Sequence, residues 1–466
     1  MFGSVIELTR ERLSLFRGLQ PQRYDRKKLF AVFLLVITAS VIDLNLNQLA
    51  DMIKDFAVSF WGVALFVAIS AIYSFGLYFI LAMVKAKIKE GEKTKRRETH
   101  FDQFENIIVT VVQYVLIALI VSVVLQTIFA TYYSTNLLTV ATTISYGFAV
   151  YLVGLLSYRL FSWFKRNKSL VVLLYGLAAS MISLNFIVSI IFFDVVLLDK
   201  PPIITPQSEV IYVGNFDPSN PIMFTIANIQ AVSYNGYFVL TWAGTILLLR
   251  HNIQRIGKVK FWALVAAPII FFMSFYIPFY QAINPSTPAQ TPLSLALPLL
   301  LLQFSVLAAA TLFAMGFRSI ASALGRASYI RDYMIITGYG FILFFTGAAA
   351  TMTGPGYPAF GLASISLVGP SSFLILTGLY RSAVSVAEDA ELRRSIKISA
   401  RKEGSNLLDS IGTAEMKLEA EQKVMAATRA SADLLAKESG VEPSMTDVEL
   451  QDLINQAIKE IRQKKH

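Results

Sequence analysis

The sequence contains no cysteine. Disulfide bonds, thiolate metal sites and cysteine nucleophiles are therefore excluded. Charged residues are also scarce: they make up 15% of the 466 residues, whereas soluble domains carry about 25%. Hydrophobic residues reach 55%. This composition excludes an ordinary soluble enzyme and a disordered protein, and it indicates a membrane protein with several spans.

Catalytic motifs are missing as well. The three histidines, His100, His251 and His466, do not form a pair at metal-ligand spacing. The sequence has no P-loop, no dinucleotide-binding glycine motif and no Gly-x-Ser-x-Gly. The apolar stretches hold few ionisable residues, Asp43 among them near the predicted outer end of the first, which disfavours a proton-coupled carrier. We predict no catalytic residue, no metal site, no cofactor and no enzymatic activity.

Ten apolar stretches approach or exceed the roughly 20 residues that cross a bilayer. They predict an all-α fold, a polytopic transmembrane helical bundle of about ten spans with a cytoplasmic helical tail. The first stretch is the weakest, because Asp43, Asn45 and Asn47 interrupt it. The predicted spans are 29–46, 56–84, 104–131, 135–162, 169–197, 222–249, 260–283, 291–316, 332–352 and 358–381.

The net charge of +10 reflects lysines and arginines in the short loops between spans. There they orient a membrane protein, so we predict no nucleic-acid partner. Outside the tail, one side of the predicted bundle holds almost all of them, and the other holds only Lys54 and Lys200. This asymmetry predicts a cell-membrane protein with an even number of spans and both termini in the cytoplasm. Trp61, Trp163 and Trp262 fall near span ends, as expected of interfacial aromatic residues.

Three parts follow along the chain. Segment 1–28 is basic and amphipathic, which predicts a helix on the membrane surface or a helix packed under the bundle. The membrane domain covers 29–382, and a helical or coiled-coil tail covers 383–466. Within the domain, 353–358 is rich in glycine and proline and forms either a plain turn or a lip over a pocket.

Neutral polar residues are concentrated in the sixth span. One helix face carries Asn228 and Asn235, and a second face carries Gln230, Tyr234 and Tyr237. Such groups hydrogen-bond one helix to another in lipid. Alternatively, they line a neutral pocket for a small uncharged or amphipathic ligand. The ligand-binding residues on that interpretation are Asn228, Gln230, Tyr234, Asn235, Tyr237 and, from the eighth span, Gln303.

The first part of the tail contains no proline and is rich in helix-forming residues, so 383–438 predicts one long helix that continues from the last span. Its apolar residues follow an interrupted seven-residue repeat, which predicts a weak coiled coil or a folded-back hairpin. The repeat falls on Ile411, Leu418, Met425 and Ala432.

A second tail helix opens with Thr446 and Glu449, which form a capping box. It carries one apolar stripe that has to be buried against the first tail helix, another subunit or a protein partner. The predicted partner-binding residues are Leu450, Leu453, Ile454, Ile458 and Ile461.

The chain around 380–389 (YRSAVSVAED) and 407–412 (LLDSIG) resembles the exit from the multi-span membrane input regions of archaeal sensor kinases. The resemblance implies an input region that passes a signal to a helical tail. The tail lacks a phospho-acceptor histidine box and a glycine-rich ATP-binding segment, so the chain is not itself a histidine kinase. A protein partner would have to carry the signal onward.

Three functions agree with these features. The first is a sensor or signalling-accessory protein that binds a small neutral or lipophilic cue and relays to a partner through its tail. The second is a facilitator or transporter of a neutral solute, favoured by prolines within the later spans and by the polar sixth span. The third is a structural subunit of a larger membrane complex.

Overall fold

The computed structural model of the protein describes residues 25–48, 54–94, 100–129, 134–198, 221–250, 292–324, 329–349, 358–391 and 406–439, with a few positions in 253–269 and 393–396. Every regular element in these residues is a helix. The predicted all-α helical bundle is confirmed. Eight helices of the described part are long and apolar enough to cross a membrane. The protein is therefore a multi-pass integral membrane protein in contact with the lipid bilayer.

The described residues contain ten long helices and two short ones, which lie close to the predicted spans and tail. The short ones are α3 (Lys54–Val58) and α13 (Leu362–Ser366). The long ones are α2 (Arg26–Gln48), α4 (Phe60–Thr94), α5 (His100–Phe129), α6 (Thr135–Arg166), α7 (Leu170–Leu198), α8 (Pro221–Arg250), α11 (Pro292–Ala323), α12 (Tyr329–Ala348), α14 (Val368–Glu388) and α16 (Asn406–Ser439).

The ninth predicted span corresponds to α12. This helix is not among the eight membrane-spanning candidates, and its first turn carries the charged residues Arg331 and Asp332. It nevertheless packs along α14 in the bundle core. Most of the seventh predicted span, 260–283, lies outside the described residues, as do 1–24, the segment 350–357 and the partner-binding residues Leu450, Leu453, Ile454, Ile458 and Ile461.

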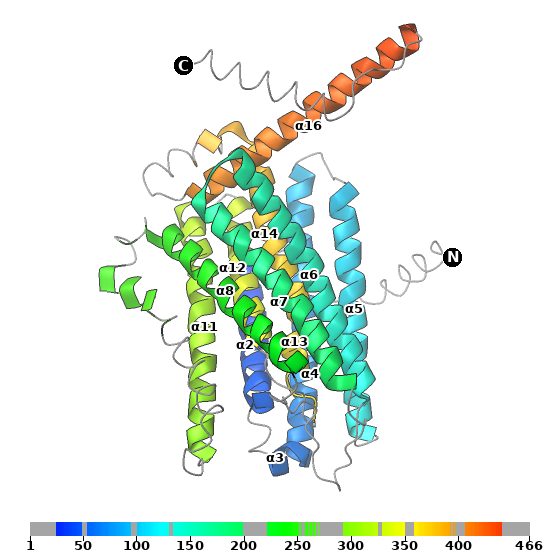
Figure 1. The fold of residues 1–466 in the computed structure, drawn as a ribbon, viewed down its shortest axis with the longest axis vertical. Coiled ribbons are helices and arrows are strands. Elements are labelled where there is room, and N and C mark those ends of the chain that lie inside the picture. The colour runs from blue at the N-terminus through cyan, green and yellow to red at the C-terminus, as the bar shows by residue number, and fades with distance from the viewer. Residues whose placement is uncertain are drawn as a thin grey trace.

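Helix α14 runs through the middle of the bundle (Figure 1). The apolar window that covers α13 and α14 is 100% buried, whereas that of α5 is only 28% buried. Exposed Val111, Val115 and Leu125 give α5 an outer apolar face, which suits contact with lipid tails. The bundle therefore has a central helix whose surroundings are all protein. Helix α16 lies at one end and α3 at the other (Figure 1).

The tenth predicted span is broken between α13 and α14. Pro370 lies in the first turn of α14 and has no backbone N–H, so the carbonyl of Ser366 loses its helical donor. The Tyr73 hydroxyl donates to that carbonyl at 2.9 Å. The Ser145 hydroxyl donates to the carbonyl of Ile365 at 2.8 Å. Side chains of α4 and α6 thus satisfy the backbone groups at the break, as a membrane interior requires.

The prediction of a single long helix over 383–438 is wrong. Helix α14 ends at Glu388, Asp389 is extended with φ −100° and ψ 110°, and α16 begins only at Asn406. The Arg393 guanidinium donates to the carbonyls of Val386 and Ala387, which are among the last of α14. These bonds replace the donors that a continuing helix would supply.

Candidate functional site

The two polar faces predicted for the sixth span are present on α8, and they differ in burial. Gln230, Tyr234 and Tyr237 are buried in the bundle. Asn228 is exposed, and Asn235 is half-buried and donates to the carbonyl of Ala231 in its own helix. The face with Gln230, Tyr234 and Tyr237 is therefore the fully buried one, although the Asn235 amide oxygen is also buried and lacks a partner among the described residues.

A hydrogen-bond network joins this buried face to α7. The amide nitrogen of Asn185 donates to the carbonyl of Gln230 at 3.0 Å and to the hydroxyl of Ser233 at 2.9 Å. The amide nitrogen of Gln230 donates to the hydroxyl of Ser189 at 3.0 Å. All four residues are buried. Gln230 thus joins two helices, the simpler of the two roles considered for it from the sequence.

The same region contains buried polar atoms that lack a hydrogen-bond partner in the described part of the chain. They are the Asn185 amide oxygen and the hydroxyl oxygens of Tyr146 and Tyr237. The Tyr237 hydroxyl lies within electrostatic reach of those of Tyr146 and Tyr234. An unpaired buried polar group costs about 1–3 kcal/mol. These atoms offer one acceptor and two donors to a small polar guest. We call Tyr146, Asn185, Gln230, Tyr234 and Tyr237 the polar cluster.

A small apolar cavity lies next to the polar cluster. Its volume is about 20 Å³, which is room for roughly one water-sized molecule. The ring of Tyr146 stacks on Phe186 with 5.3 Å between centroids, and Phe186 contacts Phe344 edge-on at 5.7 Å. Phe344 forms part of the cavity wall. A chain of three rings therefore connects the polar cluster to the cavity.

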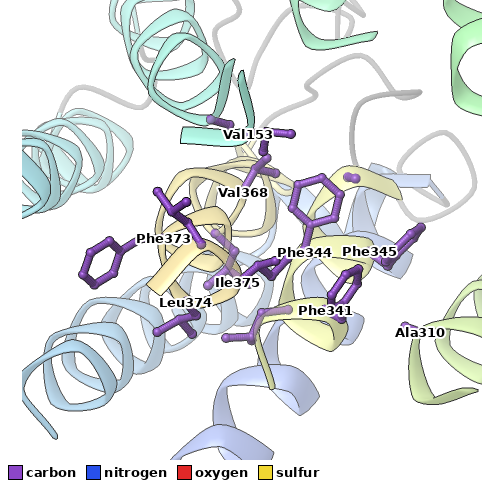
Figure 2. Packing of buried hydrophobic residues seen from close by; sticks show 14 of the residues in the cluster. Val153, Ala310, Phe341, Phe344, Phe345, Val368, Phe373, Leu374 and Ile375 are labelled. Carbon is purple, nitrogen blue, oxygen red and sulfur yellow. The ribbon is translucent and has the colours of Figure 1, made fainter. Parts of the chain in front are cut away.

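Five helices line this cavity. In Figure 2 the Phe341 and Phe344 rings of α12 lie close to Ile375 of α14, and Val153 of α6 lies at the edge of the group. Helices α7 and α8 supply the rest of the wall. The full lining is Val153, Leu156, Leu160, Tyr175, Ala178, Ala179, Ile182, Thr241, Phe341, Phe344, Ile375 and Leu379.

Three of the cavity helices, α6, α7 and α14, also contact the tail helix α16. On α14, Leu379 lines the cavity, and Val386 two turns later packs against Gly412 of α16. A Cβ atom at Gly412 would overlap the Val386 side chain, so the two backbones can approach only because this residue is glycine. On α6, Leu160 lines the cavity, and Trp163 bonds to α16 one turn later.

The Trp163 contact is a buried hydrogen bond. Its indole N–H donates to the Glu415 carboxylate at 2.6 Å, and the two residues are 1% and 3% exposed. Trp163 lies near the end of α6, where the sequence places it, and α16 covers it there. Trp61 and Trp262 are exposed, at 71% and 66%. Trp163 turns inward because the first half of α16 covers it and supplies the acceptor that its N–H needs when buried.

Polar contacts at the turn between α6 and α7 hold the same stretch of α16. Arg166 pairs with Glu421 at 2.7 Å. The Asn167 side-chain amide donates to the carbonyl of Ser410, and the Lys417 ammonium donates to the carbonyl of Arg166. We call the contacts of α16 with α6, α7 and α14 the tail dock. They fix the first half of the helix in one orientation.

The coiled-coil repeat is divided between two environments. Ile411, Ala414 and Leu418 are buried in the tail dock. Farther along α16, Met425 and Ala432 of the repeat are half-buried, and the nearby Val424 and Leu434 are exposed at 48% and 62%. The first half of the seam thus packs within the chain itself, and self-association through the second half stays a prediction.

Asp43 holds the start of the broken helix. It is 0% exposed, and its carboxylate accepts hydrogen bonds from the backbone N–H groups of Gly361 and Ser364 at 2.9 and 3.0 Å. The Ser364 hydroxyl adds a third bond at 2.9 Å. Gly361 has φ +91°, and a Cβ there would press on Asn47. Asp43 therefore acts as a side-chain cap that ties α2 to α13.

Sequence reasoning located part of this arrangement. Gln230, Tyr234 and Tyr237 lie together beside α7, while Asn228 points away and the Gln303 side chain lies outside the described residues. It missed Tyr146 and Glu415, because neither stands out from its neighbours in the sequence. Among the described residues, no group of three or more His, Asp or Glu is placed to hold a metal ion.

Comparisons of the chain with protein-family models, with curated proteins and with solved structures gave no match.

Proposed function

We propose that the protein is a membrane sensor or signalling-accessory protein. A small neutral or lipophilic cue binds at the polar cluster and core cavity, and the tail helix passes the change to a protein partner. One observation carries this proposal: α6 and α14 both line the cavity and both hold α16. A shift of one helix against the other alters the cavity and the tail dock together.

The chemistry of the cavity supports the class of cue. Its wall is apolar apart from Tyr175 and Thr241. The Tyr175 hydroxyl is hydrogen-bonded to the Thr245 hydroxyl at 2.8 Å. The unpaired polar atoms nearby are uncharged. A charged ligand would lose its hydration here without a countercharge, whereas a neutral one would not. The sparse ionisable residues of the spans support the same class.

For a cue to act through the tail, it has to change how α16 is docked. This is testable because the chain has no cysteine. Spin labels on Lys168→Cys at the start of α7 and Lys423→Cys on α16 report the distance between bundle and tail. Ala179→Val partly fills the cavity and stands in for an occupant, and Ala118→Val on the exposed face of α5 is its control.

The proposal predicts that Ala179→Val shifts the label distances and that Ala118→Val leaves them unchanged. Trp163→Phe serves as the reference for a loosened tail dock. Identical distance distributions in the wild type and in a folded Ala179→Val variant would exclude coupling between cavity and tail.

A second function, passage of a neutral solute, is favoured by the broken helix α13–α14. Helices interrupted in mid-membrane form substrate sites in many transporters, and here Asp43 and Tyr73 hold the interruption. Stopped-flow light scattering of proteoliposomes with glycerol or urea tests this function. Flux that exceeds empty liposomes and falls in Asn235→Leu would favour transport over sensing.

A further inference from the structure

A salt-bridge cluster joins α2, α4 and α12 at the end of the bundle where α2 begins. The Asp332 carboxylate accepts from Arg26 at 2.6 Å and from Lys87 at 3.0 Å, and Lys87 also pairs with Glu90 at 3.3 Å. The two cations and two carboxylates neutralise each other. Any further cation beside this cluster therefore adds unbalanced positive charge.

Two further arginines add positive charge: Arg331 beside this cluster, and Arg318 on α11, which packs against α12. Arg331 is the neighbour of Asp332, and its Nε is buried without a hydrogen-bond partner. Arg318 on α11 is exposed, and neither arginine forms an ion pair within the described residues. Orientation of the protein by basic loops requires positive charge at this end, but it does not require a guanidinium with a buried, unpaired N–H.

Both arginines lie beside one face of α12, which packs against α11. Arg331, Ile335 and Tyr339 recur every four residues along α12 and are all half-buried, so they share one face. The Tyr339 ring stacks on Phe33 of α2, with 4.2 Å between centroids, and lies within electrostatic reach of Arg318. The face therefore lies between α2 and α11. We call this face, together with Arg318, the basic face.

An apolar surface continues from the basic face along α2. Phe30 and Leu34 are exposed at 48% and 53%, and the Phe30 ring lies 6.5 Å from that of Tyr339. Unpaired guanidinium groups bind phosphate through paired, charge-assisted hydrogen bonds. A free phosphate ion would use the arginines but not the neighbouring apolar surface, whereas a phospholipid uses both.

We propose that the basic face binds a phosphate-bearing anionic lipid, with the headgroup on Arg318 and Arg331 and an acyl chain along Phe30 and Leu34. Basic pockets between transmembrane helices are suited to such headgroups. Lipid occupancy would supply the partner that the buried Arg331 N–H lacks. This site lies apart from the polar cluster and does not depend on the sensing proposal.

The test uses the full chain in mild detergent. Phosphatidylglycerol or phosphatidylcholine is added, and native mass spectrometry records the lipid that stays bound while thermal unfolding records its effect. We expect phosphatidylglycerol to bind and raise the unfolding temperature, and phosphatidylcholine to do so much less. In Arg318→Gln/Arg331→Gln, the affinity for phosphatidylglycerol should fall about tenfold or more.

The matched control is Lys423→Gln/Lys437→Gln, which removes two exposed positive charges from α16 and should bind the lipid like the wild type. If the arginine-to-glutamine variant fails to fold, Arg318→Lys/Arg331→Lys keeps the charge but loses paired hydrogen bonding, and it should bind more weakly than the wild type. Equal phosphatidylglycerol binding in the wild type and in the arginine variants would overturn the proposal. So would an equal temperature shift with inorganic phosphate alone, which would assign the site to a free anion.

Discussion

The indole N–H of Trp163 and the carboxylate of Glu415 form a 2.6 Å hydrogen bond although 252 positions separate them in the chain. Both side chains are almost completely buried. The carboxylate therefore depends on this donor, because a buried charge without hydrogen bonds is strongly destabilising. The bond makes the tail helix part of the membrane domain rather than an independent extension.

Trp163→Phe should release the tail helix. The phenylalanine keeps the aromatic packing but leaves Glu415 buried without its donor, which costs about 1.5–3 kcal/mol. The undocked fraction of α16 should therefore rise by roughly ten- to a hundredfold. The mobility of a spin label on Lys423→Cys measures it. Trp61→Phe, at an exposed tryptophan, and Glu438→Gln, at an exposed acid on α16, should leave the label unchanged. A Trp163→Phe tail as immobile as the wild type would contradict this role.

The crossing of α12 and α14 predicts a contrast between two glycines. A Cβ at Gly378 would lie 2.7 Å from the carbonyl oxygen of Tyr333, while a Cβ at Gly147 on α6 has nothing within 4 Å. Gly378→Ala should destabilise the bundle by about 1–3 kcal/mol through overpacking. Gly147→Ala should be neutral or stabilise it by up to about 1 kcal/mol. Thermal unfolding in detergent compares the two, and equal unfolding temperatures would show that α12 and α14 do not pack this closely.

Asp43 is expected to stabilise the bundle through α13. Asp43→Ala leaves the N–H groups of Gly361 and Ser364 without an acceptor inside the protein, at a cost of about 2 kcal/mol or more. Asp43→Asn keeps one acceptor oxygen and should fall between Ala and the wild type. Thr38→Ala is the control, because its hydroxyl bonds only within its own helix on an exposed face. An Asp43→Ala protein that unfolds at the wild-type temperature would exclude the capping role.

The positions of the helices could be predicted from the sequence because a run of about 20 apolar residues has few alternatives in a membrane protein. The two faces of α8 followed from helical periodicity alone. The end of α14 at Glu388 could not, since residues 383–389 favour a helix and the break depends on Arg393 and on the docking of α16. The capping role of Asp43 could not be predicted either. The sequence indicates only a residue near the outer end of a weak span, because the N–H groups that Asp43 caps are 318 or more positions away in the chain.

The orientation of the bundle gives a fourth prediction. The basic loops predict that the α16 end lies in the cytoplasm, and α3 lies at the opposite end (Figure 1). In intact cells, a membrane-impermeant maleimide should therefore label Asp55→Cys on α3 but not Lys423→Cys on α16. The absence of native cysteines removes background labelling. Permeabilised cells are the control, in which both positions should react. Labelling of Lys423→Cys in intact cells would contradict the predicted orientation and place α16 outside the cell.

Two buried tyrosines should respond in opposite ways to loss of the hydroxyl. The Tyr73 hydroxyl satisfies the carbonyl of Ser366 beside Pro370, so Tyr73→Phe leaves a buried acceptor unpaired and should destabilise the protein by about 1–3 kcal/mol. The Tyr237 hydroxyl has no protein partner in the described residues. If the polar cluster is empty, Tyr237→Phe removes an unpaired group and should be neutral or stabilising.

The same pair of variants reports on the occupant of the polar cluster. Thermal unfolding of Tyr237→Phe is measured in delipidated protein and again after addition of a candidate neutral ligand. The comparison distinguishes the effect of the substitution on the protein from its effect on ligand binding. A ligand that hydrogen-bonds to the Tyr237 hydroxyl should stabilise the wild type more than Tyr237→Phe, while it stabilises Tyr73→Phe as much as the wild type. A ligand that stabilises all three proteins equally binds elsewhere. A Tyr237→Phe loss as large as that of Tyr73→Phe without added ligand would show that this hydroxyl is already paired, either with the neighbouring Tyr234 hydroxyl or with a bound water or lipid.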